Sequence, residues 1–175
     1  MSKTAILLSG GIDSIALTYW KKPDVAITVN YGQAPAETEI RTSATIAKAL
    51  NIPHYIVTAD CSKLGSGDLL NQAALSVSPS SEWWPYRNQL LVTLACMKGI
   101  ALGIGELMLA SVKSDGFHKD GTAQFYKLMS QLSAGALDVA ICPMNPAAVA
   151  EGFQFVPVLP GRNVIACGSH HPLLR

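Results

Sequence analysis

Charged residues are scarce in this sequence, and neither sign is in clear excess. They make up 14% of the 175 residues, and the formal net charge is +1. Soluble domains usually carry about a quarter of charged residues. A nucleic-acid-binding protein would need a basic face, and no run of lysine and arginine supplies one. We therefore expect no nucleic-acid partner.

Long apolar runs and targeting signals are also missing. No apolar run approaches the roughly 18 residues needed to cross a bilayer. The N-terminus leads into only about five apolar residues, too few for a signal peptide. These absences predict a cytoplasmic protein with no membrane partner.

Cysteine is sparse and scattered. The four cysteines are Cys61, Cys96, Cys142 and Cys167, and no pair has CxxC spacing. In a cytoplasmic chain this pattern predicts reduced structural thiols rather than disulfides or a zinc knuckle.

What the chain does contain is a large apolar fraction, 49%, with a periodicity that alternates along the sequence. Short apolar runs predict strands, and apolar residues at helical spacing predict helices. We expect strands at 5–8, 25–29, 54–58 and 107–112, and helices at 15–20, 36–50, 87–102 and 122–132. This alternation predicts an α/β fold, a three-layer α/β/α sandwich with a parallel, Rossmann-like sheet. Residues 61–84 show no period and predict a long loop.

The composition changes after residue 134. Five of the ten prolines fall in the last 41 residues, and proline interrupts helices. We expect residues 1–134 to form the α/β domain. Residues 135–175 are expected to form a divergent, proline-rich C-terminal segment, with a strand near 153–158, and not a separate domain.

A glycine-rich turn, Ser9-Gly10-Gly11-Ile12-Asp13-Ser14, follows the first predicted strand. Adjacent glycines permit backbone conformations closed to other residues. The amides of such a turn and of the helix after it favour an anion such as phosphate. No lysine follows at the spacing of a Walker-type loop. The alternative is a plain strand-to-helix turn with Asp13 or Ser14 as the N-cap.

The letters SGGIDS resemble the SGGxDS loop of the PP-loop ATP pyrophosphatase superfamily, whose members have an adenine nucleotide alpha hydrolase-like fold. These proteins cleave ATP to activate a substrate, usually by adenylation. The resemblance implies that residues 1–134 bind ATP with Mg²⁺. The loop residues it implies are Leu8, Ser9, Gly10, Gly11, Ile12, Asp13 and Ser14.

Further motifs resemble one branch of that superfamily, the 7-cyano-7-deazaguanine synthases of the QueC family. Tyr31-Gly32-Gln33 is similar to its YGQ, and Arg87-Asn88 to its PGRN segment. The stretch from Lys113 to Asp120, followed by Phe125, is similar to the segment after the fourth strand of the family. Together these motifs cover about residues 4–133.

The resemblance implies an ATP-dependent ligase of queuosine biosynthesis. It would convert 7-carboxy-7-deazaguanine, a 7-deazapurine, and ammonia into 7-cyano-7-deazaguanine. The implied catalytic residues are Asp13, Arg87, Lys113 and Asp120, and the implied substrate contacts are Tyr31, Gln33, Asn88 and Asp115. Asp13 suits either a Mg²⁺ ligand or a cap, and Arg87 suits an anionic group. A homodimer is compatible with this interpretation.

Several positions depart from the family pattern. YGQ is followed by Ala34-Pro35 instead of a basic residue and histidine. The segment after the fourth strand reads D-C-R-x-x-F in the family, and here Asp120-Gly121-Thr122 stands in place of D-C-R, so the arginine is absent. The family ends in a cysteine cluster that binds Zn²⁺, and that ligand cluster is not present in this sequence. Cys167 and His170 are weak metal candidates. Two alternatives therefore stay open, a tRNA-modifying adenylation enzyme and an ATP-binding module without turnover.

Overall fold

The computed structural model describes residues 2–111, 119–132, 141–143, 153–157 and 163–168. Its main feature is a sheet of four parallel strands in the order β3-β2-β1-β4. The strands are β1 (Lys3–Leu7), β2 (Val25–Asn30), β3 (His54–Thr58) and β4 (Ile104–Met108). In the register, Ala5 pairs with Val25 on one side and with Leu107 on the other. The predicted α/β fold with a parallel sheet is confirmed.

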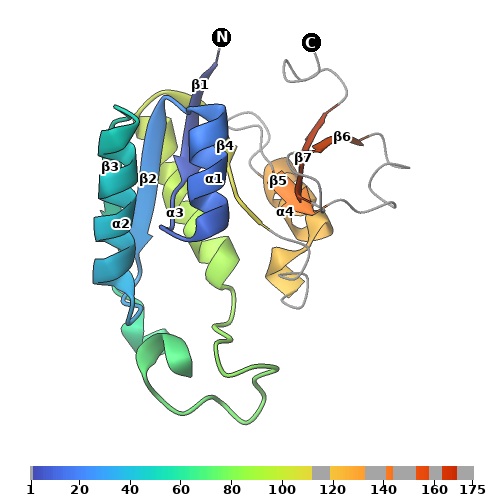
Figure 1. The fold of residues 1–175 in the computed structure, drawn as a ribbon. Helices are drawn as coiled ribbons and strands as arrows, with labels where there is room; N and C mark the ends of the chain where they lie inside the picture. The colour runs from blue at the N-terminus through green and yellow to red at the C-terminus, as the bar shows by residue number, and fades with distance from the viewer. Residues whose placement is uncertain (1, 112–118, 133–140, 144–152, 158–162, 169–175) are drawn as a thin grey trace.

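Helices cover both faces of this sheet (Figure 1). One face packs against α1 (Ile12–Lys21) and α2 (Ala36–Ala49), with Leu17 and Ala47 in the apolar cluster. The other face packs against α3 (Arg87–Ala101), and α4 (Ala123–Leu132) adds Tyr126 to that cluster. The result is the predicted three-layer sandwich.

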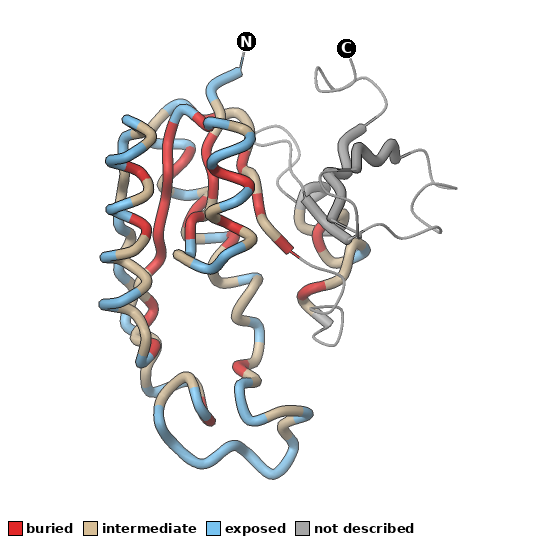
Figure 2. The backbone as a smooth tube through the Cα atoms, in the orientation of Figure 1, coloured by how far each residue is buried: buried red, intermediate tan, exposed pale blue. Residues whose placement is uncertain are grey.

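Strand β2 lies in the middle of the core. Residues Val25 to Val29 are all at most 5% exposed, and Figure 2 shows the buried strands between exposed helix surfaces. A strand covered on both faces needs apolar residues at successive positions, which explains why the run Val25 to Val29 has a single polar residue, Thr28.

The order of the strands creates a switch point beside β1. The chain moves outward from β1 to β2 and β3, and then crosses back to place β4 on the other side of β1. Ligands of open α/β sheets bind outside the carboxyl ends of the strands at such a reversal. We therefore expect the functional site at the carboxyl end of β1, where the strand order reverses.

Strand β4 begins and ends earlier than the sequence predicted. It runs from Ile104 to Met108 instead of 107–112. Gly103, at φ +69°, ends α3 sharply, so the strand starts directly after it. Leu109 to Ser111 consequently extend past the sheet, where they line a cavity.

The connection from β3 to α3 is the long loop that the sequence predicted, with two short 3-10 helices, η1 (Ser62–Leu64) and η2 (Asp68–Leu70). Trp84 at its end is 4% exposed. Its ring meets Tyr31 edge-on, with centroids 5.0 Å apart. The loop is thus tied to the end of β2 by an aromatic contact.

A second, antiparallel sheet follows α4. Its strands are β5 (Ile141–Pro143), β6 (Phe153–Pro157) and β7 (Asn163–Gly168), in the order β5-β7-β6. The predicted strand near 153–158 corresponds to β6. Within the described ranges, none of the helices is long and apolar enough to cross a membrane.

Candidate active site at the carboxyl edge of the sheet

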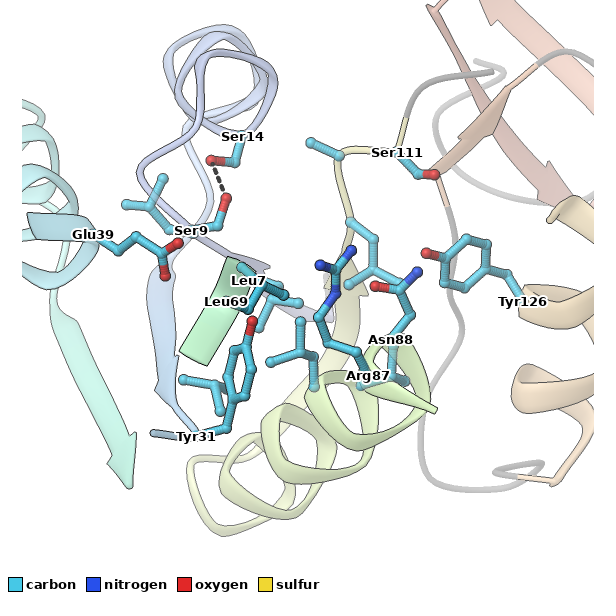
Figure 3. A pocket seen from close by; sticks show the side chains of 16 residues that line it. Leu7, Ser9, Ser14, Tyr31, Glu39, Leu69, Arg87, Asn88, Ser111 and Tyr126 are labelled. Carbon is cyan, nitrogen blue, oxygen red and sulfur yellow. Dashed lines mark hydrogen bonds between the residues drawn. The ribbon is translucent and has the colours of Figure 1, made fainter. Parts of the chain in front are cut away.

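A cavity of about 250 Å³ lies at the switch point. It opens at the carboxyl ends of β1, β2 and β4 and is closed by the helices that follow or precede these strands. Its polar lining residues are Ser9, Ser14, Tyr31, Glu39, Arg87, Asn88, Ser111 and Tyr126, and the rest of its lining is apolar (Figure 3).

The glycine loop forms one wall of this cavity. Gly10 has φ +78°, and a Cβ atom there would lie 3.0 Å from the carbonyl oxygen of Glu39. Only glycine combines this backbone conformation with such a close approach to α2. The loop therefore needs its glycine both for the turn and for packing.

Hydroxyl groups hold the loop in shape. Ser14 Oγ donates to the carbonyl of Gly11 at 2.8 Å and lies 3.2 Å from Ser9 Oγ. The N-cap of α1 is Gly11, with no side-chain hydrogen bond to the cap. The alternative of a turn capped by Asp13 or Ser14 is therefore wrong, because Ser14 donates to the loop instead of accepting from the helix.

The root of the loop is fixed by a hydroxyl network. The carbonyl of Leu8 accepts hydrogen bonds from Thr28 Oγ1 at 2.6 Å and from Ser43 Oγ at 3.1 Å. Thr28 Oγ1 also lies 2.7 Å from His54 Nε2. Because the single Thr28 proton goes to Leu8, the His54 nitrogen is the donor. Burial lowers the pKa of His54.

Strand β2 is followed by the predicted Tyr31-Gly32-Gln33 motif. The side chain of Tyr31 lines the cavity and that of Gln33 does not. Tyr31 lines the cavity and is 5% exposed. Gln33 is 3% exposed and lies outside the lining. Its amide accepts from the Tyr31 N–H at 2.9 Å and donates to Glu39 Oε2 at 2.7 Å. Gln33 therefore links the backbone of Tyr31 to the side chain of Glu39.

Tyr31 lies between opposite charges. Burial raises the pKa of its phenol to about 12, the Glu39 carboxylate adds to this, and the Arg87 guanidinium opposes it by charge and hydrogen bonding. The phenol therefore keeps its proton at neutral pH and serves as a hydrogen-bond donor.

The N-terminus of α3 brings Arg87 and Asn88 to the cavity. Figure 3 shows the Arg87 guanidinium extending into the centre of the view, between Tyr31 and Asn88. Tyr86, with φ +57°, sets the turn into the helix. Asp120 lies in the 3-10 helix η4 (Lys119–Gly121), and its carboxylate accepts the Asn88 backbone N–H at 2.9 Å. The structure thus uses Asp120 to hold the start of α3.

Three of the polar lining residues were not predicted from the sequence. Glu39 lies inside an amphipathic helix, Ser111 lies inside the strand that the sequence predicted at 107–112, and Tyr126 belongs to the apolar face of α4. None of these positions carries a local sequence signal for a site.

The remaining predicted site residues lie outside the lining of the cavity or outside the residues that the structure describes. Asp13 is partly exposed and is not in the lining. Lys113, Asp115 and His170 lie outside the described residues, and of Cys167 only the strand β7 is described. Across the described ranges, no group of three or more His, Cys, Asp or Glu side chains could hold a metal ion. In the second sheet Cys142 pairs with Val164, so it is not opposite Cys167.

The fold and the cavity define a class: an α/β protein with a PP-loop-like turn on its first strand and a ligand site at the switch point. Sequence comparison then gives the family. The model of the family described as "Queuosine biosynthesis protein QueC" matches residues 3–151. The chain belongs to the QueC family, as its motifs predicted.

Similar curated proteins carry one name. The chain is 29% identical to 7-cyano-7-deazaguanine synthase 1 of Desulfitobacterium hafniense, in a match that covers 78% of this chain and 66% of the relative. It is 31% identical to the 7-cyano-7-deazaguanine synthase of Bdellovibrio bacteriovorus, in a match that covers 70% of this chain and 60% of the relative. The chain thus spans less than two thirds of the length of these relatives.

Proposed function

We propose that this protein is an ATP-dependent ligase that converts 7-carboxy-7-deazaguanine and ammonia into 7-cyano-7-deazaguanine. The observation that carries the proposal is the cavity at the switch point of a QueC-family fold, where Ser9 and Ser14 of the glycine loop share one lining with Arg87.

The residues present suit the phosphates of ATP. The first turn of α1 has no side-chain cap, so its N–H groups are available to an anion. Ser9 adds a hydroxyl beside them, whereas the Ser14 hydroxyl already donates its proton to the Gly11 carbonyl. When bound, ATP supplies the phosphoanhydride that turns a carboxylate oxygen into a leaving group.

Glu39 is a carboxylate in a site otherwise suited to anions. It would repel phosphate unless a cation lay between them. Mg²⁺ usually takes one or two protein carboxylates together with phosphate oxygens. We assign this role to Glu39, held in place by Gln33 at 2.7 Å, alongside the earlier candidate Asp13.

Arg87 and Tyr31 suit the acid to be activated. The guanidinium matches a carboxylate in two-pronged geometry. The Tyr31 phenol, with its pKa raised to about 12, stays a donor beside it. Their work is to hold the carboxylate and to neutralise charge as it develops, since this chemistry depends mainly on positioning and electrostatics.

The test is pyrophosphate release from ATP by the full chain with Mg²⁺ and ammonium, with and without 7-carboxy-7-deazaguanine. We expect release that depends on the heterocyclic acid, with 7-cyano-7-deazaguanine as the product. ATP binding without turnover, or turnover only with tRNA, would contradict the proposal.

A further inference from the structure

Gln33 is buried, and both ends of its amide are bonded within the protein. Its side chain is 3% exposed and does not line the cavity. The amide oxygen accepts the backbone N–H of Tyr31 at 2.9 Å. The amide nitrogen donates to the carbonyl of Val29 at 3.3 Å and to Glu39 Oε2 at 2.7 Å. Both amide protons are thus in use inside the protein, so Gln33 does not suit a direct contact with substrate.

The backbone sets the orientation of this amide. A backbone N–H can only donate, so the amide atom that faces the N–H of Tyr31 must be the oxygen. The nitrogen consequently faces Glu39 and presents a donor to its carboxylate. The distance of 2.7 Å is at the short end of the range for N–H···O hydrogen bonds. Gln33 therefore holds the Glu39 carboxylate in one orientation.

A second contact holds the backbone of Glu39. This residue lies in the first turn of α2. A Cβ atom at Gly10 would lie 3.0 Å from its carbonyl oxygen and 3.3 Å from its Cα, so the glycine loop and α2 touch at this point. Figure 3 shows the Glu39 carboxylate beside Ser9, on the loop side of the cavity. Backbone and side chain are thus both fixed next to the loop that suits phosphate.

We propose that Gln33 is a positioning residue, which holds the Glu39 carboxylate against the glycine loop as a ligand for the divalent cation of a bound nucleoside triphosphate. The inference rests on the proposed function and deepens it, and it concerns only the nucleotide half of that function. Among the described residues, the hydrogen bond to the Glu39 carboxylate goes to Oε2, which leaves Oε1 for the cation. Residues that orient a metal ligand typically contribute 10–100-fold to metal affinity.

A purely structural role makes a different prediction. In that role Gln33 accepts the N–H of Tyr31 and closes the turn between β2 and α2, and its donor to Glu39 is irrelevant to binding. Removal of the amide then lowers stability, and any effect on nucleotide binding is the same with and without a cation. The two roles are separated by the dependence on the cation.

The experiment is a double-mutant cycle of Gln33→Met and Glu39→Gln in the full chain. Methionine is an unbranched side chain of similar length that cannot donate a hydrogen bond. Calorimetric titration measures the affinity for a non-hydrolysable ATP analogue, once with saturating Mg²⁺ and once with EDTA. With Mg²⁺, we expect Gln33→Met to weaken the analogue by about 10- to 100-fold. With EDTA, we expect no loss, because there is no cation to hold.

The Glu39→Gln background gives the decisive comparison. Without the carboxylate, Gln33 has nothing to position, so Gln33→Met should change the affinity with Mg²⁺ by less than about twofold. Gln72→Met, the same substitution at an exposed glutamine of the loop between β3 and α3, is the matched control and should change neither affinity. If Gln33→Met does not fold, Gln33→Asn takes its place, since this shorter amide cannot reach both partners.

The outcomes distinguish this inference from the function on which it rests. A wild-type affinity in Gln33→Met with Mg²⁺ overturns the inference alone, as does an equal loss with Mg²⁺ and with EDTA, or an equal loss in the two backgrounds. A wild type that binds the analogue no better with Mg²⁺ than with EDTA overturns the cation role of Glu39 and this inference with it. A chain that shows the expected cycle but forms no 7-cyano-7-deazaguanine supports the inference and contradicts the ligase.

Discussion

The Asp120 carboxylate accepts the backbone N–H of Asn88 at 2.9 Å, across 32 positions of the sequence. It thereby acts as a cap on α3 that comes from a distant segment, because Tyr86, the residue at the N-cap, makes no side-chain cap bond. The contact links η4 to the helix that presents Arg87. A residue that the family motif marked as catalytic therefore has a positioning task in this structure.

The first prediction separates these two roles of Asp120. Asp120→Asn keeps an oxygen that can accept the N–H but cannot ionise, whereas Asp120→Ala removes the acceptor. We expect Asp120→Ala to lower the free energy of unfolding by about 1 kcal/mol and to raise KM, since the start of α3 loosens. Asp120→Asn should keep most of the stability and of kcat. Thermal unfolding and steady-state kinetics measure both, and a kcat abolished by Asp120→Asn would instead support general acid or base catalysis.

The second prediction concerns Arg87. Arg87→Lys keeps the charge and loses the planar fork that matches a carboxylate. We expect kcat/KM for 7-carboxy-7-deazaguanine to fall by about 10- to 100-fold, the effect of a lost charge-assisted contact, with little change in thermal stability. Arg41→Lys, on the exposed surface of α2, is the matched control and should be silent. Equal kcat/KM values for the two variants would show that Arg87 does not bind the carboxylate of the substrate.

The third prediction uses two glycines with similar backbones. Gly10 has φ +78° and Gly103 has φ +69°, but a Cβ atom at Gly103 would meet nothing within 4 Å. Gly103→Ala should therefore lower the free energy of unfolding by only about 1 kcal/mol, because alanine is strained in the left-handed conformation. Gly10→Ala should cost about 2–3 kcal/mol, because the added methyl also presses on the backbone of α2. Urea unfolding of both variants gives the difference, and equal losses would mean that the contact with α2 is unimportant.

Much of the domain could be predicted because its signals are local. Strand β2 is almost wholly apolar because both of its faces are buried. Helix α2 has apolar residues at helical spacing because only one of its faces is buried. The QueC motifs identified the loop, Tyr31 and Arg87 because their order along the chain matches strand ends and a helix start. The start of α4 is also local, because Thr122 Oγ1 accepts the Phe125 N–H at 3.2 Å, as a threonine cap does.

What could not be predicted depends on contacts between distant segments. Nothing in the sequence near Gln33 says that its amide is shared between Tyr31 and Glu39. The place of Glu39 in the cavity depends on how α2 packs against the glycine loop. That Ser111 Oγ has no hydrogen-bond partner among the described residues depends on what surrounds it. Such facts follow from the packing of the layers and not from the spacing of residues.

The last prediction is a dependence of stability on pH through His54. Burial lowers the pKa of His54 in the folded state, so between the folded and unfolded pKa values the unfolded chain binds more protons. Stability therefore rises with pH through this window. His54 contributes fully above its unfolded pKa of about 6.5, and this contribution is lost as pH falls below that value. The hydrogen bond to Thr28 survives protonation, since Nε2 is the donor in both forms.

The measurement is the free energy of unfolding between pH 7.5 and 5 for the wild type and His54→Gln, whose side-chain amide can still donate to Thr28. We expect the wild type to lose more stability than the variant on acidification, with a difference in slope below about 1.4 kcal/mol per pH unit, the limit for one group. Asp24 and Asp60 have lowered carboxyl pKa values and titrate below this range, so they do not mask the effect. Parallel curves for the two proteins would show that burial at His54 does not disfavour its charged form, and that the root of the glycine loop is insensitive to pH.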